Sequence, residues 1–110
     1  MGSGAQPALA DALARLWTKF LPEILERVRV LERAAAALSA GTLGAEECSA
    51  AAAAAHKLAG VLGTFGFAQG TALAREAEVA YSADPAVDPA GATRLQQIAR
   101  EIDEIIRAHG

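Results

Sequence analysis

The chain has 110 residues, a net charge of −3 at pH 7 and 53% hydrophobic residues. This length corresponds to one domain, and the apolar fraction is sufficient for one core. The ten lysines and arginines are scattered along the sequence, which argues against a nucleic-acid partner. No apolar run reaches the length of a membrane span, and no charged-then-apolar leader opens the chain. We therefore expect a cytoplasmic domain with no membrane association. We also expect a monomer, because the charged faces of the last two helices leave no second apolar stripe for a partner copy.

The first residues differ from the rest of the chain. Met1-Gly2-Ser3-Gly4 is typical of a remnant of an added tag, so we expect residues 1–6 to be disordered and residues 7–110 to form the domain. Pro7 suits the first turn of a short opening helix that ends before Pro22. The apolar residues on one side of this helix, which we expect to cover one end of the domain, are Leu9, Leu13, Leu16 and Trp17.

Helical periodicity continues beyond Pro22. A second helix is expected from about 21 to 38, with apolar residues at helical spacing, and Ser39-Ala40-Gly41-Thr42 ends it. A third helix is expected from about 44 to 65. Glu46 and Glu47 stabilise a helix N-terminus, where the helix dipole is positive, and Gly66 marks the C-terminus.

Two further helices complete the pattern, one from about 68 to 81 and one that ends near Ala108. Between them, Pro85, Pro89 and Gly91 predict a loop. Arg75, Glu76 and Glu78 are expected on the outer side of the fourth helix, and His109 is expected to fray without a role. The predicted fold is all-α, an antiparallel four-helix bundle with a short additional N-terminal helix.

The third expected helix carries one histidine outside its apolar stripe. That stripe follows 3-4 spacing through Cys48, Ala51, Ala55, Leu58, Leu62 and Phe65. Since His56 lies about 130° from the centre of the stripe, its ring should face solvent. Its neighbours along the same side are small: Ala52, Ala53, Ala59 and Gly60, with Gly63 two turns on. Each glycine costs about 0.5–1 kcal/mol relative to Ala in a helix, so the pair indicates close approach, by a partner or by a neighbouring helix.

The stretch from His56 to Gly60 resembles the His-x-Leu-Lys-Gly pattern of histidine phosphotransfer (HPt) domains, the relay modules of two-component phosphorelays. His56, Leu58 and Gly60 match this pattern, and the similarity extends from Pro7 to Ala108. Ala59 stands where the family has lysine. Lys57 lies about 200° away from that position around the helix.

The resemblance implies that His56 is the phosphoacceptor, which takes a phosphoryl group from the aspartate of one response-regulator receiver domain and passes it to another. The implied phosphoryl and partner surface consists of Lys57, Ala59, Gly60, Gly63, Ala52 and Ala53. The implied partners are receiver domains, which supply Mg²⁺, and a hybrid histidine kinase. We expect no cofactor bound by this chain and no metal site, because no second set of ligands has suitable spacing with His56. We also expect no kinase activity, because the glycines do not follow a strand as in nucleotide loops.

Two functions remain open. One is this phosphorelay intermediate, and the other is a non-catalytic helical docking module, a degenerate HPt domain that binds a receiver or kinase without being phosphorylated. Ala59, in place of the family's lysine, keeps the second function open. Lys57 is either a solvated charge or a contact to a partner acid or to the phosphoryl oxygens. A dimeric histidine kinase core is a weaker third interpretation, because it requires a following ATP-binding domain.

Overall fold

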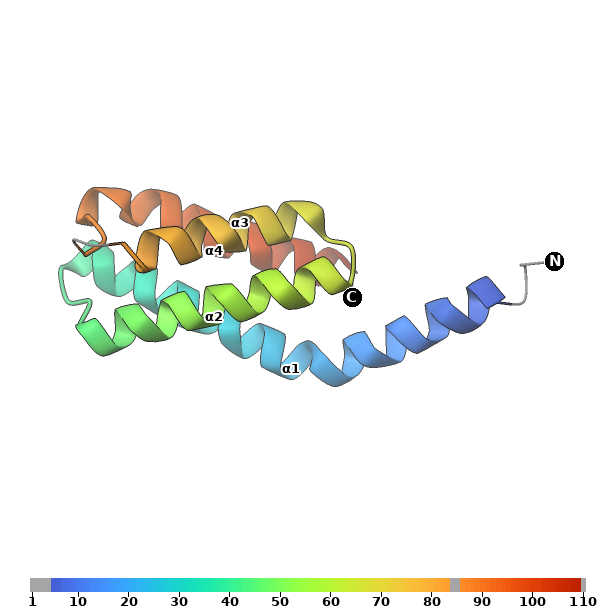
Figure 1. Ribbon diagram of the computed structural model, residues 1–110. Helices are drawn as coiled ribbons and strands as arrows, with labels where there is room; N and C mark the ends of the chain where they lie inside the picture. Colours follow the sequence, from blue (N-terminus) through green and yellow to red (C-terminus); the bar gives the residue numbers. More distant parts are fainter. Residues whose placement is uncertain (1–4, 84–85, 110) are drawn as a thin grey trace.

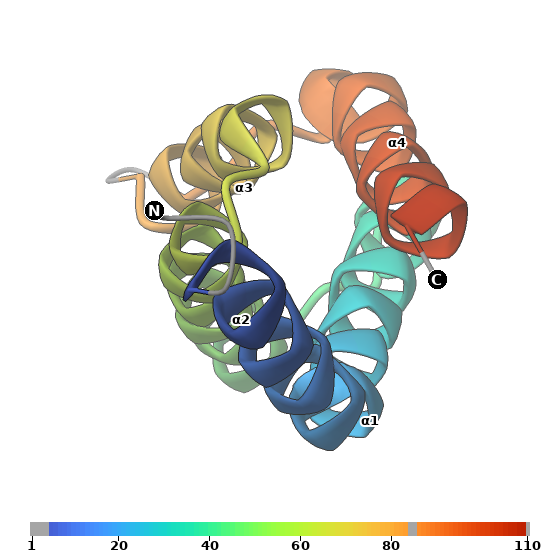
Figure 2. The same cartoon turned by 90° about the vertical axis from the view of Figure 1, so that its right-hand side faces the viewer.

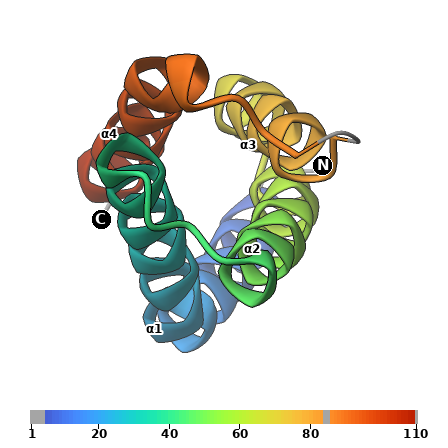
Figure 3. The same cartoon turned by 90° about the vertical axis from the view of Figure 1, so that its left-hand side faces the viewer.

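The computed structural model describes residues 5–83 and 86–109; residues 1–4, part of the segment expected to be disordered, lie outside it. Its elements are α1 (Ala5–Ala40), α2 (Ala45–Thr64), α3 (Ala68–Tyr81), the short 3₁₀ helix η2 (Pro89–Gly91) and α4 (Ala92–His109). Consecutive α-helices run in opposite directions (Figure 1), and the two end views (Figures 2 and 3) show them around one common axis. The predicted all-α antiparallel four-helix bundle is confirmed.

Each helix contributes an apolar side to a shared core. The largest fully buried side chains come from α1, α2 and α4: Ile24, Val28, Leu31, Leu58, Leu62, Ile98, Ile102 and Ile106. Helix α3 contributes small residues such as Ala74 and Ala77. A Cβ atom added at Gly70 of α3 would lie 3.1 Å from Cδ1 of Leu62. Helices α2 and α3 are therefore closely packed, and this brings their polar edges into contact.

The prediction of a short N-terminal helix that ends before Pro22 is wrong, because α1 continues through Pro22 without interruption. Pro22 is exposed, while the buried positions keep one phase on both sides of it, from Trp17 to Ile24 and Val28. A proline lacks the N–H for one helical hydrogen bond and crowds the carbonyl one turn earlier, so it bends a helix. Figure 1 shows that the axis of α1 is bent and that its N-terminal part extends beyond the bundle. Trp17 packs against the bundle end, but Leu9, Leu13 and Leu16 before it are 62%, 37% and 42% exposed, so the first turns of α1 do not cover that end.

The turn between α2 and α3 has a defined geometry. Gly66 adopts a φ of 83°, which favours glycine. Its N–H donates to the carbonyl of Gly63 (3.1 Å), and the N–H of Phe67 donates to the carbonyl of Leu62 (2.9 Å). These two bonds form a Schellman motif, so α2 ends as predicted, and the short turn sets how α3 returns along α2.

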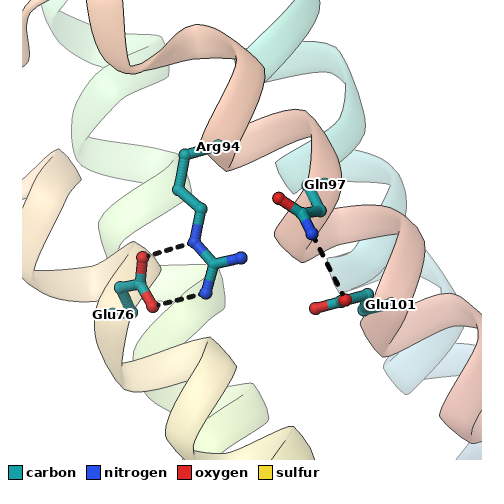
Figure 4. Close-up of polar contacts among 4 residues, drawn as sticks. All are labelled: Glu76, Arg94, Gln97 and Glu101. Carbon is teal, nitrogen blue, oxygen red and sulfur yellow. Dashed lines mark hydrogen bonds and ion pairs between the residues drawn. The ribbon is translucent and has the colours of Figure 1, made fainter.

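An ion pair joins α3 to α4. Arg94 donates from Nε to Oε2 of Glu76 (2.7 Å) and from Nη2 to Oε1 (2.8 Å), while Gln97 and Glu101 form a separate contact along α4 (Figure 4). The hydrogen bond and charge of Arg94 lower the pKa of Glu76. This two-point contact helps to fix the rotation of α3 about its own axis.

An aromatic cluster packs at the end of the bundle near the α2–α3 turn. The ring of Trp17 lies 5.1 Å from that of Phe65 and 4.7 Å from that of His109, centroid to centroid. Phe67 also packs on His109, at 4.9 Å. The expectation that His109 frays is wrong, because these aromatic contacts hold the last turn of α4.

Candidate functional site

His56 lies in the second half of α2, and 73% of its side-chain surface is exposed. The prediction that its ring faces solvent is confirmed. The buried side of α2 is wider than the predicted stripe, because it also includes Ala54 and Ala59, whereas Cys48 and Phe65 are only half-buried.

Glu78 of α3 is the polar partner of His56. Oε2 of Glu78 lies 2.8 Å from Nδ1 of His56, and 30% of the Glu78 side chain is exposed. An ionised carboxylate can only accept, so Nδ1 carries the proton of this bond. In the neutral ring, Nε2 then holds a free electron pair. The sequence interpretation placed Glu78 on the outer side of its helix but missed this pairing.

The small residues near His56 divide into two groups. Ala53 and Gly60 are exposed, and a Cβ atom at Gly60 would meet nothing within 4 Å. A Cβ atom at Gly63 would lie 3.4 Å from Oγ1 of Thr71 on α3. Ala52 is half-buried. Gly60 therefore leaves open surface beside the imidazole, whereas a side chain at Gly63 would be in van der Waals contact with α3.

Ala59 is 3% exposed, so its predicted place on the exposed phosphoryl surface is wrong. Its carbonyl accepts a hydrogen bond from Oγ1 of Thr71 on α3 (3.3 Å). Lys57 is exposed. None of the ion pairs among the described residues includes Lys57.

This arrangement equips the outer nitrogen of His56 to act as a nucleophile. Bond formation at Nε2 gives the imidazole a positive charge, and the carboxylate of Glu78 already lies where it stabilises that charge. Within residues 5–83 and 86–109, no group of three or more His, Cys, Asp or Glu side chains could hold a metal ion. None of the described helices is long and apolar enough to cross a membrane.

Fold and site together define a class of protein: a helical bundle that presents one carboxylate-bound histidine on the outside of a helix. The model of the Hpt domain family matches residues 15–108, and the chain belongs to this family. Hpt domains perform histidine phosphotransfer in phosphorelays, with response regulators and kinases as partners. Comparisons with curated proteins and with solved structures gave no match.

Proposed function

We propose that this domain relays a phosphoryl group between the aspartates of receiver domains through Nε2 of His56. The observation that supports this proposal is the 2.8 Å contact of Nδ1 with Glu78, on a ring that is 73% exposed. Among the described residues, Nε2 has no hydrogen-bond partner. The nitrogen that must reach a partner is thus the one left free.

The proposed transfer needs no general base. The electron pair of Nε2 attacks the phosphorus of an aspartyl phosphate, and the N–P bond forms as the bond from phosphorus to the aspartate oxygen breaks. The aspartate leaves as a carboxylate. Nδ1 keeps its proton throughout, and Glu78 stabilises the positive ring until a second receiver aspartate takes the phosphoryl group by the reverse step.

The partner completes the site in this proposal. The receiver brings Mg²⁺, which neutralises charge on the transferring group, and the chain itself binds no cofactor. The open surface at Gly60, where a Cβ atom would meet nothing within 4 Å, gives the partner room to approach. We propose that the exchange takes place in the cytoplasm and that the domain acts as a monomer.

The test uses receiver domains already phosphorylated on aspartate, with Mg²⁺, and three proteins: the wild type, His56→Gln and His109→Gln. His109 is the second of the two histidines of the chain and serves as the matched control. We expect intact mass to show one acid-labile phosphoryl group on the wild type and His109→Gln, and none on His56→Gln.

A second candidate is a docking module that binds a receiver without being phosphorylated. The observation that favours it is Ala59, which stands where the HPt pattern has lysine. Ala59 is uncharged and 3% exposed. Absence of transfer from every phosphorylated receiver, despite measurable binding to one of them, would support this module and overturn the relay.

A further inference from the structure

A phosphoryl group on His56 would add negative charge beside an existing carboxylate. Glu78 already occupies the Nδ1 side of the ring at 2.8 Å. Ala59, one turn along the same helix, is uncharged and buried. A cation near Nε2 would offset this accumulation of negative charge, and α2 offers Lys57 as its nearest one.

The register of α2 and α3 identifies a second cation. The two helices contact each other at two fixed points: Nδ1 of His56 with Oε2 of Glu78 (2.8 Å), and the carbonyl of Ala59 with Oγ1 of Thr71 (3.3 Å). Arg75 lies four residues after Thr71 and three before Glu78, so it shares their side of α3. It therefore lies opposite the stretch of α2 between His56 and Ala59.

Arg75 is also free to bind a ligand. It is exposed, and the six ion pairs among the described residues do not include it. Arg94, on the next helix, is instead bound at two points to Glu76. The guanidinium group presents several N–H donors in a planar fork that matches phosphoryl oxygens, which a lysine ammonium does not.

We propose that Arg75 binds the oxygens of a phosphoryl group on Nε2 of His56 and so stabilises the phosphorylated state. This inference rests on His56 being the phosphoacceptor of the proposed function. Arg75 forms and breaks no covalent bond. It donates hydrogen bonds from α3 to the group that α2 carries, and Glu78 and Arg75 bind the two ends of one phosphoimidazole.

The test phosphorylates the full chain with phosphoramidate, so that it does not depend on a cognate receiver. Nε2 of His56 displaces ammonia from phosphorus in that reaction. The variants are Arg75→Ala, Arg75→Lys and, as the matched loss of one exposed charge beside His56, Lys57→Ala. Far-UV circular dichroism and thermal unfolding establish that each variant is folded.

The readout is the pH titration of the ³¹P resonance, together with the lifetime of the phosphohistidine. A bound guanidinium favours the doubly charged phosphoryl group, so we expect Arg75→Ala to titrate at a pH higher by about 0.5 to 1 unit. Arg75→Lys should recover part of this shift, because it restores the charge but not the fork. Lys57 follows His56 directly and so lies about 100° away around α2, so we expect Lys57→Ala to shift the titration less than Arg75→Ala does.

A ³¹P titration of Arg75→Ala that coincides with that of the wild type would overturn the role of Arg75, as would a shift seen only in Lys57→Ala. The relay is judged separately by transfer from phosphorylated receivers. Arg75→Ala should slow that transfer roughly tenfold, as expected for one charge-assisted hydrogen bond at an exposed site. A wild type that titrates as expected but accepts nothing from any receiver would overturn the proposed function and leave the Arg75 contact established.

Discussion

The substitution Gly60→Ala should change the stability of the fold and the rate of phosphotransfer in opposite directions. Within the chain, a Cβ atom at this position would meet nothing within 4 Å. Gly60 lies inside α2, where glycine is less favourable than alanine by about 0.5–1 kcal/mol. We therefore expect Gly60→Ala to raise the free energy of unfolding by about that amount, which corresponds to a rise of a few degrees in Tm.

The same methyl group should impair phosphotransfer. Gly60 is one helical turn from His56, so the added carbon stands on the surface that a receiver must approach. Overpacking a tight contact costs about 1–3 kcal/mol, so kcat/KM for transfer from a phosphorylated receiver should fall at least about fivefold. The matched control is Gly63→Ala. Its Cβ atom would contact Oγ1 of Thr71 at 3.4 Å, so we expect a smaller gain in stability than at Gly60.

Thermal unfolding followed by circular dichroism measures the first effect, and stopped-reaction phosphotransfer kinetics measure the second. A less stable Gly60→Ala would show that the space beside Gly60 is not open. A more stable variant with unchanged transfer kinetics would refute the argument that a partner needs this surface.

Three further outcomes follow from particular contacts. Glu78→Gln, which keeps the size of the side chain but removes the charge 2.8 Å from Nδ1 of His56, should slow phosphotransfer about three- to tenfold with little change in Tm, measured in the same kinetic assay. Gly66→Ala should lower the free energy of unfolding by about 1–2 kcal/mol in urea titrations, because the φ of 83° disfavours a Cβ atom. Burial and the nearby Cys48 raise the pKa of Tyr81 from 10.0 to about 12, so its contribution to stability is complete below pH 10 and is lost as the pH rises through 12. Urea titrations at pH 9 and pH 11.5 should show that Tyr81→Phe, which also removes a buried hydroxyl without a hydrogen-bond partner, unfolds with a weaker pH dependence than the wild type.

Much of the helix pattern could be predicted because local chemistry determines it. Gly41 and Gly66 end helices through their positive φ values of 73° and 83°, and glycine at such a position is readable from sequence. The bounds of α3, Ala68–Tyr81, agree with those predicted.

The predicted end of a helix before Pro22 is wrong because it depends on the local penalty of a proline alone and ignores the packing on both sides of it. The half-buried and buried positions Trp17, Leu21, Ile24, Val28 and Leu31 follow uninterrupted 4-3-4-3 spacing across it. Pro22 itself falls on the exposed side. Continuous burial along one stripe therefore outweighs one lost hydrogen bond, and the unbroken phase was the available signal.

The pairing of His56 with Glu78 was missed because it depends on how two helices align. The signal lay in the short turn: with α2 ending at Thr64 and α3 beginning at Ala68, positions at similar distances from the turn become neighbours. The burial of Ala59 has the same origin. Periodicity within α2 gives the direction of each of its side chains, but the position of α3 decides which side of α2 is covered.

The chain has one tryptophan and one tyrosine, and the bundle places them at opposite ends. Trp17 is 4% exposed and packs beside Phe65 near the α2–α3 turn, whereas Tyr81, also 4% exposed, ends α3 and accepts through its carbonyl from Cys48 near the start of α2. Each chromophore therefore reports on its own end without a label. Coincident fluorescence and tyrosine-absorbance transitions would define a single cooperative unit, and separated ones would show which end opens first.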